Sequence, residues 1–521
     1  AISEANESDT ILVAEEGYTL NAGIVADKNL LIIGENKDTT IVTTSNQGTY
    51  GAFQAVNDCQ LTLMNLTFKT GLDALERNGN YLVGTGLLTG KTEIVIDNCK
   101  IDGYYTAVYM NNAAPNHNKL AIQNCAITNC DWAYSIDHIT PGSQDIPGEN
   151  LVFTGNMGVV EREVFPNANA RVIDADGITQ SVHSTIQAAI DAADAGDTIL
   201  VAPGTYKEQL VVDKALSILG RNASIAGTGT RNDEVIITYP DDLKDDYLEL
   251  VYIGADDVTF SGFSLDDGDY EVDTNGITVH GDNVQITNNI LDGFSYVQIL
   301  ATSYIWNETA NKWETKFIDD ILIEGNYAKN ALNYTAIYMQ GASGSVQNNQ
   351  IENAPRAIQI QPYGNSNGGT VKNNTVSAYT TGIWYNYARK GAGPWEIKQN
   401  TISAVAIPSG FTPVVSTWAG LEVQTFGTEG TGVAPSVTFT GNFVDGSGAS
   451  TTAGWTAVYG LSMTPNIHND ATATFTDNTF TNVEVGAYKG AGTLDLDAVR
   501  GTNTFDEGSI VVGDQILIPE A

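Results

Sequence analysis

Lysine and arginine are scarce in this sequence of 521 residues, which has 24 of them against 62 aspartate and glutamate residues and a formal net charge of -38. Binding to nucleic acid needs concentrated positive charge that neutralises phosphates. We therefore expect no nucleic-acid partner, and anionic membrane surfaces are disfavoured for the same reason. An acidic surface of this kind is typical of a well-solvated exported protein and can collect divalent cations.

Cysteine is also rare, with four residues that all fall in the first quarter of the chain: Cys59, Cys99, Cys125 and Cys130. They are too few and too local for a disulfide scaffold, and their spacing matches no zinc-binding pattern. Cys99 and Cys125 hold equivalent places in adjacent repeats. Neighbouring strands lie about 4.8 Å apart, so the spacing is compatible with a disulfide or with a stacked pair of buried free thiols.

Long apolar runs are absent, because no stretch of 18 or more apolar residues occurs. The sequence therefore predicts no membrane-inserted segment. No leader peptide is visible at the first residue, and we expect any such leader to have been removed. The expected location is extracellular, either secreted or on the cell surface.

Against these absences, one short unit recurs along the chain. It consists of alternating apolar residues followed by asparagine and then a further apolar or small polar residue, as in LTLMNLTF, VQITNNIL and SVQNNQIE. The recurring asparagines in the second half of the chain are Asn289, Asn326, Asn349, Asn374, Asn400, Asn442 and Asn478. Copies in the first half of the chain place Asn65, Asn98 and Asn124 at the same point.

This repeat predicts a solenoid of short strands. Alternation with a period of two indicates strands with one buried face, and a short strand cannot bury that face by itself. Parallel stacking of successive coils produces one continuous core. The asparagines are expected to stack at a bend, where they tolerate left-handed dihedral angles and hydrogen-bond along the stack. The predicted fold class is all-β, a right-handed parallel β-helix.

A second repeat divides the chain into modules. Residues 9–14 and 197–202 both read DTILVA, and Tyr18 matches Tyr206. In the second copy a short amphipathic helix is expected before the strand, with Ser184 or Thr185 as the N-cap. Such a helix would cover the open end of a solenoid. We therefore predict a first module over residues 1–168 and a second over residues 169–521, with the capping helix at the start of the second.

The stretch STIQAAIDAADAGDTILVAPGTYKEQLVVDKALSILG, residues 184–220, resembles the opening of pectin methylesterases and of the wider pectate-lyase-like β-helix superfamily. It is equally similar to β-helix modules of large bacterial surface proteins. The resemblance implies the fold, which hosts many activities. The longer catalytic sequence contexts of the methylesterase and polygalacturonase families are absent as sets, so no catalytic residue is carried over.

The densest acidic run suggests a cation site. It lies in SLDDGDYEVD and comprises Asp266, Asp267, Asp269, Glu271 and Asp273. Carboxylates that alternate around a glycine could hold Ca²⁺, which takes six to eight oxygen ligands. A solvated acidic loop is the alternative interpretation.

An aromatic patch is the candidate contact site for a carbohydrate or a protein. It comprises Tyr363, Trp384, Tyr385, Tyr387, Arg389, Trp395 and Trp418. Stacked coils would place several of these side chains on one flank, and aromatic faces beside polar groups bind sugar rings. The alternative is that they pack a long loop against the solenoid.

Three hypotheses of function follow. The first is an extracellular or cell-surface structural protein that assembles head-to-tail with other copies of itself into a filament or surface layer. The second is a polysaccharide-binding or adhesive module, and the third is a polysaccharide lyase or hydrolase. Because no catalytic motif is recognisable, the sequence favours the first two over an enzyme.

Overall fold

The computed structural model of the protein describes residues 4–44, 51–56, 58–71, 80–88, 90–112, 118–128, 130, 132–137, 151–154, 170–175, 179–240, 249–268, 273–307, 311–413, 415–450, 455–463, 472–490, 494–506 and 516–517. Contacts divide the chain into two compact units, Ala1–Ala202 and Pro203–Ala521. Each unit is described by itself. The predicted module boundary between residues 168 and 169 lies outside the described residues and stays a prediction.

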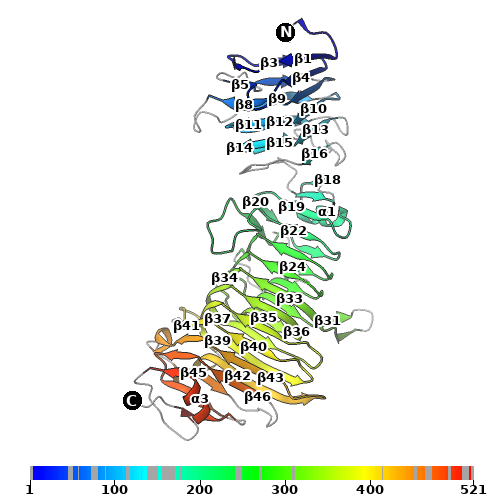
Figure 1. The fold of residues 1–521 in the computed structure, drawn as a ribbon. Helices are drawn as coiled ribbons and strands as arrows, with labels where there is room; N and C mark the ends of the chain where they lie inside the picture. The colour runs from blue at the N-terminus through cyan, green and yellow to red at the C-terminus, as the bar shows by residue number, and fades with distance from the viewer. Residues whose placement is uncertain are drawn as a thin grey trace. The chain divides into compact units, whose positions relative to one another are not determined.

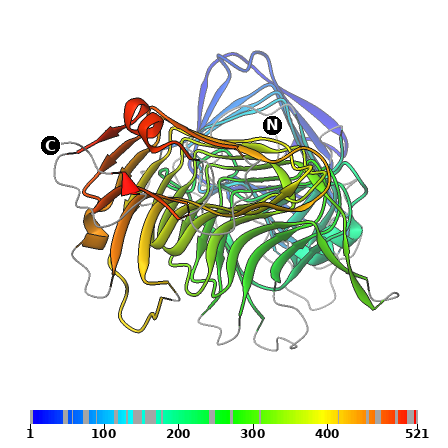
Figure 2. The ribbon, with the colours of Figure 1, turned by 90° about the horizontal axis from the view of Figure 1, so that it is seen from below.

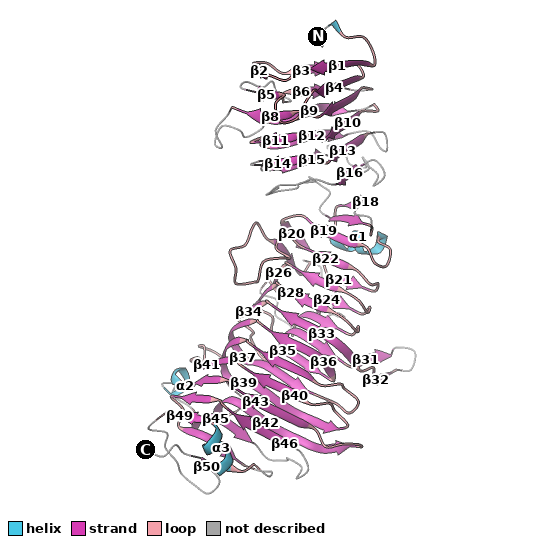
Figure 3. Ribbon diagram, viewed as in Figure 1, coloured by secondary structure: helices cyan, strands magenta, loops and turns pink. Residues whose placement is uncertain are grey.

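The unit Ala1–Ala202 contains a parallel β-helix with three sheets, here called faces A, B and C (Figures 1 and 3). Each complete coil contributes one strand to each of the three faces. Face A consists of β1 (Asp9–Val13), β4 (Leu30–Gly34), β7 (Gln60–Met64), β10 (Glu93–Asp97), β13 (Lys119–Gln123) and β16 (Leu151–Thr154). Face B consists of β2 (Gly17–Leu20), β5 (Ile41–Thr44), β8 (Thr67–Thr70), β11 (Lys100–Asp102) and β14 (Ala126–Thr128). Face C consists of β3 (Ile24–Ala26), β6 (Phe53–Ala55), β9 (Tyr81–Leu88), β12 (Thr106–Asn112) and β15 (Trp132–Asp137).

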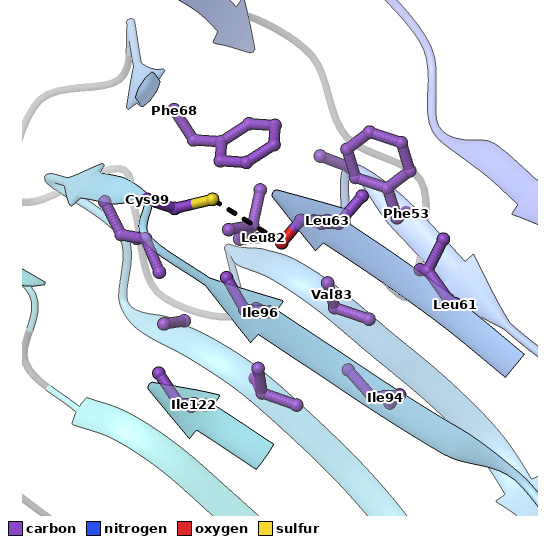
Figure 4. Packing of buried hydrophobic residues seen from close by; sticks show 14 of the residues in the cluster. Phe53, Leu61, Leu63, Phe68, Leu82, Val83, Ile94, Ile96, Cys99 and Ile122 are labelled. Atoms are coloured by element: carbon purple, nitrogen blue, oxygen red, sulfur yellow. Dashed lines mark hydrogen bonds between the residues drawn. The ribbon is translucent and has the colours of Figure 1, made fainter. Parts of the chain in front are cut away.

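The core of this unit is made by apolar residues that stack in register from coil to coil. On face A, Leu63 pairs with Ile96, and Ile96 pairs with Ile122. All three side chains are fully buried (Figure 4). Alternation along each strand directs every second side chain into the core, which is the arrangement that the period-two pattern predicts.

The same unit also contains the predicted helix and its neighbouring strands: β17 (Ala170–Ile173), β18 (Thr179–His183), α1 (Ile186–Ala192) and β19 (Thr198–Val201). Thr185 is the N-cap of α1, because its side chain accepts a hydrogen bond from the Ala188 N–H at 3.2 Å. The helix buries Ile186, Ala189 and Ile190, as its periodicity predicts. Strand β17 pairs antiparallel with β18 and β19, which departs from the parallel order of the coils.

The unit Pro203–Ala521 is a longer parallel β-helix with the same three faces (Figures 1 and 2). Face A consists of β22 (Ser217–Leu219), β25 (Thr259–Ser261), β28 (Gln285–Thr287), β33 (Ile318–Glu324), β36 (Ala342–Gln347), β38 (Gly369–Lys372), β40 (Trp395–Lys398), β43 (Ser436–Thr440) and β46 (Thr472–Thr476). Face B consists of β20 (Gly204–Lys207), β23 (Val235–Thr238), β26 (Ser264–Asp266), β29 (Ile290–Asp292), β34 (Tyr327–Lys329), the first part of β37 (Gln350–Gln361), the first part of β39 (Thr375–Lys390), β41 (Thr401–Ala404), β44 (Phe443–Asp445), β47 (Thr479–Thr481) and β49 (Thr504–Phe505).

Face C of this unit carries the candidate site. It consists of β21 (Leu210–Val212), β24 (Glu249–Ile253), β27 (Asn275–Val279), β30 (Val297–Thr302), β35 (Thr335–Gln340), the second parts of β37 and β39, β42 (Thr417–Gly430), β45 (Ala457–Met463), β48 (Val485–Lys489) and β50 (Ile516–Leu517). Strands β37 and β39 are long because each runs from face B through a bend into face C. The remaining elements are α2 (Ser447–Ser450), α3 (Leu496–Thr502) and the hairpin of β31 (Tyr304–Asn307) and β32 (Lys312–Thr315).

The asparagine stack is confirmed in this unit and lies at the turn from face A to face B. From Asn326 onward, each side chain accepts a hydrogen bond from the backbone N–H of the preceding ladder asparagine and donates one to the next, as between Asn349, Asn374 and Asn400 at 2.9–3.0 Å. Asn289, the first member, accepts from the Phe263 N–H instead. All seven predicted members are at most 2% exposed. The stack runs on to Asn503, which the sequence reading missed.

Two parts of the ladder prediction need correction. The left-handed residue of each turn is not the stacked asparagine but the residue before it, such as Asn348 with φ 56° and Asn373 with φ 55°. The stacked asparagine is retained for its hydrogen bonds. In the unit Ala1–Ala202, Asn65, Asn98 and Asn124 occupy that left-handed position, with φ of 58°, 51° and 53°.

The stacked position in the unit Ala1–Ala202 is therefore taken by the next residue, which is cysteine in two adjacent coils. The backbone N–H of Cys99 lies 3.5 Å from the Cys125 sulfur, and the Cys99 thiol donates to the Leu63 carbonyl at 3.6 Å (Figure 4). A ladder asparagine likewise accepts from a backbone N–H of the preceding coil and donates to a backbone carbonyl of that coil. The cysteine thiols take the same two places, but they form weaker hydrogen bonds. All four cysteines are buried free thiols, which settles the alternative that the sequence left open.

Candidate functional site

Two rows of outward side chains cross face C of the unit Pro203–Ala521. The inward row is Ile337, Ile358, Ile383 and Leu421, which pair in register and are fully buried. The next residue of each strand points to the opposite face. The first outer row is Tyr338, Gln359, Trp384 and Glu422. The second outer row is Thr335, Arg356 and Thr381, which lie two residues before the inward row and are placed on the outer side by their side-chain contacts with Gln359, Trp384 and Glu422.

Four planar side chains stack beside these rows and form what we call the planar column: Tyr296, Tyr334, Arg356 and Trp384. The rings of Tyr296 and Tyr334 are 4.9 Å apart and inclined by 11°. The Arg356 guanidinium lies 5.1 Å from the Tyr334 ring centre and 4.5 Å from that of Trp384. The column follows the solenoid axis because each of its members comes from the next coil along the chain.

Arg356 is the central member of the planar column and is only partly exposed. Burial lowers the pKa of Arg356, although a guanidinium remains charged in proteins. No ion pair joins it to a carboxylate among the described residues. Its Cζ atom lies over both rings, and no hydrogen bond joins its guanidinium N–H groups to another described residue.

Glu422 is the only carboxylate in the two outer rows. Its Oε2 accepts a hydrogen bond from the Thr381 hydroxyl at 3.1 Å. Burial raises the pKa of Glu422, while the Thr381 hydrogen bond and the charge of Arg356 oppose that rise. The site thus combines one cation and one carboxylate that influence each other electrostatically without direct pairing.

Side-chain amides fill the space beneath the planar column. Thr335 donates to Gln359 Oε1 at 3.2 Å, and Gln359 Nε2 donates to Asn386 Oδ1 at 3.3 Å. On the neighbouring strand, Tyr338 donates its hydroxyl proton to the Gln361 amide oxygen. Burial raises the pKa of Tyr338 well above its usual range, so this hydroxyl acts as a hydrogen-bond donor and not as a base.

A small pocket of about 170 Å³ opens beside the guanidinium. Its lining includes Asn333, Pro355, Thr380 and Phe411 in addition to Arg356. Sites for drug-sized ligands usually measure about 300–1,000 Å³. The pocket therefore suits a single polar substituent and not a whole ligand.

The sequence-predicted aromatic patch divides into two groups. Trp384 is in the planar column, Arg389 lies 4.4 Å from the ring centre of Tyr363 at the far edge of face C, and Tyr387 is 48% exposed. The other group is in the interior: Tyr385, Trp395 and Trp418 are fully buried. Trp418 donates its indole N–H to the Ala378 carbonyl at 3.1 Å. These three side chains pack the core and cannot reach a ligand at the surface.

The sequence reading missed Tyr296, Tyr334, Arg356 and Glu422. A signal for three of them was present, because Tyr296 and Arg356 each follow a ladder asparagine by seven residues and Tyr334 follows one by eight. Alignment of the coils on the ladder would have placed them together. Glu422 follows its ladder asparagine, Asn400, by 22 residues, so an inserted loop hides its position.

The predicted calcium site falls partly outside the described residues, because Asp269 and Glu271 are not described. Asp266 accepts a hydrogen bond from the Gly268 N–H at 2.9 Å, and Asp267 is 4% exposed. Asp273 is exposed. Among the described residues, no group of three or more acidic, histidine or cysteine side chains is placed to hold a metal ion. Calcium binding stays a prediction.

No helix in the described part of the chain is both long and apolar enough to cross a membrane.

Among solved structures, the chain is similar to enzymes that act on polysaccharides. The catalytic unit of a GH87 α-1,3-glucanase from Streptomyces thermodiastaticus strain HF3-3 is 12% identical over 88% of this chain, with a TM-score of 0.19. The match covers 65% of the glucanase, so this chain spans less than two thirds of its length. A PL6 alginate lyase in complex with a trisaccharide is 12% identical, with 92% of this chain and 81% of the lyase covered and a TM-score of 0.20. A periplasmic alginate epimerase is 10% identical, with 87% and 76% covered and a TM-score of 0.18.

TM-scores this low carry no argument about activity. No curated protein matches the chain. Residues 172–354 match a family model described as Protein of unknown function (DUF1565). Together, this match and the stacked parallel sheets confirm that the chain is a right-handed parallel β-helix of the kind found in the pectate-lyase-like superfamily.

Proposed function

We propose that this chain is an extracellular or cell-surface protein that binds a polysaccharide along face C of the unit Pro203–Ala521. The observation that carries the proposal is the planar column, which presents Tyr296, Tyr334, Arg356 and Trp384 along the solenoid axis. Strand spacing repeats these groups about every 4.8 Å. An extended polymer with a regular repeat can therefore contact one coil after another.

The chemistry of the column favours a polyhydroxylated ligand. Because the rings stack within the column, a ligand meets the outer edges of the rings and the hydroxyls of the two tyrosines. Tyr296 is 40% exposed, and Tyr334 is partly exposed. Glutamine side chains lie at the same level, where partly exposed Gln340, Gln361 and Gln424 extend the polar surface. Apolar walls with a few converging polar groups are typical of ligand sites.

Binding is favoured over hydrolysis by the count of carboxylates. Most glycosidases use a pair of carboxylic groups that flank the scissile bond. The two outer rows hold one carboxylate, Glu422, and its Oε2 is occupied by the Thr381 hydroxyl. Lyase chemistry needs a base, and the raised pKa of Tyr338 makes that hydroxyl a poor one.

The test is affinity electrophoresis of the full chain in gels that contain neutral or acidic plant, algal or bacterial polysaccharides. At least one polymer should retard the wild-type protein, and Tyr334→Ala should weaken that binding about threefold to tenfold. The matched control is Trp313→Ala, which removes an aromatic side chain that is 65% exposed on the hairpin strand β32. Equal losses in both variants, or no retardation by any polymer, would contradict the proposal.

A second measurement separates binding from catalysis. We expect no release of reducing or unsaturated sugars from any polymer that binds. Turnover that disappears in Glu422→Gln would replace the binding role with an enzymatic one.

A further inference from the structure

The first coil of the unit Ala1–Ala202 is repeated in the coil that follows helix α1, and the repeat is longer than the DTILVA segment. Residues 24–36 read IVADKNLLIIGEN, and residues 210–222 read LVVDKALSILGRN. Identical residues include the pair Asp27-Lys28 and the pair Asp213-Lys214. We call residues 9–36 the first repeat and residues 197–222 the second repeat. Both have apolar residues at the same places of one coil.

The turn at the start of each repeat is also the same in structure. Asp9 and Asp197 each accept a hydrogen bond at Oδ2 from the backbone N–H three residues earlier, at 2.7 and 2.9 Å. The residue before each aspartate is left-handed, with φ of 66° at Ser8 and 97° at Gly196. In the second repeat this turn comes directly after α1, whose C-cap is Ala193. The first repeat therefore begins with the turn that elsewhere ends a capping helix.

The two repeats differ in how far their apolar side chains are covered. In the second repeat, Ile199 and Val201 of β19 are at most 4% exposed, and α1 lies against β19. The matching residues of β1, Ile11 and Val13, are partly exposed. The same difference holds for the next matching pairs, Tyr206 with Tyr18 and Leu210 with Ile24. Equivalent side chains are thus covered in one coil and uncovered in the other.

The uncovered side chains of the first repeat line a cavity of about 760 Å³. Strands β1, β2 and β3 are the outermost strands of faces A, B and C at this end of the unit (Figure 3). The lining reaches Phe53 and Phe68 of the following coils, and its charged residues are Asp27 and Lys28. The Lys28 ammonium group donates to the Ala5 carbonyl at 2.9 Å. The cavity therefore leaves part of the apolar core uncovered within the described residues.

We infer that this cavity is a docking site for an amphipathic helix of the α1 type, offered by another polypeptide segment. Helix α1 gives the chemistry of the occupant, because it buries Ile186, Ala189 and Ile190. These positions are spaced i, i+3 and i+4, which places the three side chains on one face of a helix. Docking of such a face would remove the apolar lining from water, and it is separate from polysaccharide binding on face C.

The repeat favours a helix over two other occupants. A two-fold contact with a second copy of the chain would place two cavities opposite each other, so neither would be filled. A free apolar ligand would match the volume, which lies within the usual range of ligand sites. However, the equivalent coil of the same chain has a helix against its first strand.

The experiment measures binding of a labelled peptide with the sequence of residues 183–196, HSTIQAAIDAADAG, to the full chain by fluorescence anisotropy. A lactam between Gln187→Lys and Asp191 keeps the short peptide helical, which circular dichroism verifies. We expect saturable binding of one peptide per chain. A peptide with Ile190→Asp should bind at least about tenfold more weakly, because it loses the burial of one isoleucine side chain. The matched control is Ala192→Asp, which adds the same charge at an exposed position of α1.

Two variants of the chain assign the binding to the cavity. Val25→Asp introduces a charge into the lining at a side chain that is 51% exposed, and it should weaken peptide binding at least about tenfold. Leu12→Asp is the matched control, because Leu12 is 77% exposed in the same coil and lies outside the lining. Circular dichroism melting of both variants verifies that the fold is retained.

Each outcome supports or overturns the inference. It is wrong if the helical peptide does not bind, if the Ile190→Asp and Ala192→Asp peptides bind equally well, or if Val25→Asp binds as tightly as Leu12→Asp. Light scattering without peptide that shows a dimer, lost in Val25→Asp, would assign the cavity to a second copy of the chain. Retardation by a polysaccharide should be the same in Val25→Asp and the wild type, so the inference and the proposed function fail separately.

Discussion

A single buried asparagine in this solenoid satisfies two backbone groups of the preceding coil and contacts the asparagine side chain of the next coil. Asn374 donates to the Val346 carbonyl and to Asn400 Oδ1, both at 2.9 Å, and it accepts from Asn349. The side chain is 1% exposed, so water cannot replace these partners. Hydrogen bonds, and not backbone shape, therefore hold each ladder asparagine in place.

Replacement of Asn374 by leucine should lower the free energy of unfolding by roughly 1–3 kcal/mol, because buried donors and acceptors lose their partners. Urea denaturation measures the change. The matched control is Asn373→Gly at the exposed left-handed residue with φ 55°, which glycine adopts freely. An Asn374→Leu variant as stable as the control would show that the ladder contributes nothing.

His280 makes stability depend on pH. Burial lowers its pKa to about 4, and the charge of Lys316 acts in the same direction, while the backbone of Thr302 opposes them. The unfolded chain takes up this proton near pH 6.5, and the folded protein does so only near pH 4. As pH falls between these values, the unfolded state binds more protons and the folded state becomes less stable.

The wild-type protein should therefore lose about 2–3 kcal/mol of stability between pH 7.5 and 4.5 that His280→Gln does not lose. Urea denaturation of both proteins at the two pH values gives the difference, in which the contributions of the many acidic groups cancel. An identical pH dependence in both proteins would show that His280 is not held neutral in the fold.

At the scale of the strand, close stacking of coils leaves no room for some side chains. Gly344 in β36 has φ 144°, and a Cβ atom there would lie 2.0 Å from the Ile321 carbonyl oxygen. Residues with a side chain rarely adopt this positive φ, and the neighbouring strand leaves no room for a methyl group unless the backbone moves. The sequence around Gly344, ASGSVQ, gives no sign of this close contact.

Gly344→Ala should therefore destabilise the protein by about 2–3 kcal/mol, since the backbone of β33 or β36 must shift. Gly501→Ala in helix α3 should change the stability in the opposite direction, because a Cβ atom there would meet nothing within 4 Å. Alanine there should stabilise the helix by about 0.5–1 kcal/mol. Thermal melting that moves both variants in the same direction would contradict this assignment.

At the scale of the whole molecule, the unfolding of the two compact units can be followed separately, because the cysteines and most of the tryptophans lie in different units. All four cysteines lie in the unit Ala1–Ala202 and are at most 3% exposed. Six of the seven tryptophans lie in the unit Pro203–Ala521. Hydrogen bonding with Cys125, together with burial, raises the pKa of Cys99, so this thiol is unreactive in the folded protein.

We therefore expect no thiol to react with a disulfide reagent in native protein, and four to react in strong denaturant. In a urea titration, thiol reactivity should follow the first unit and tryptophan fluorescence mainly the second. Independent units should have different midpoints. Coincident transitions for both probes would show that the chain unfolds as one cooperative body.

Head-to-tail assembly also belongs to this scale and stays a prediction. The first coil of the unit Ala1–Ala202 surrounds an apolar cavity of about 760 Å³, with Ile11, Val13 and Tyr18 in its lining. Light scattering of concentrated protein with and without Ca²⁺ tests assembly. A monomer under both conditions would exclude it.

The fold of this protein can be predicted from its amino-acid sequence. The period-two alternation and the recurring asparagines repeat from coil to coil, and the capping pattern before residue 197 is local. These patterns can therefore be recognised without knowledge of tertiary contacts. They sufficed for the parallel strands, for helix α1 and for the buried ladder. They did not separate the left-handed turn residue from its stacked neighbour, because asparagine suits both places.

Which residues share the outer surface depends on strand pairing and cannot be predicted from the repeat pattern. Loops of different length separate the coils, so that Trp384 follows its ladder asparagine, Asn374, by 10 residues and Glu422 follows Asn400 by 22. Strand pairing nevertheless places these two side by side in register. The same pairing directs Trp395 and Trp418 into the core and Arg356 into the planar column. Composition cannot supply this result, because the inward or outward direction of a side chain depends on its register within the coil and not on its residue type.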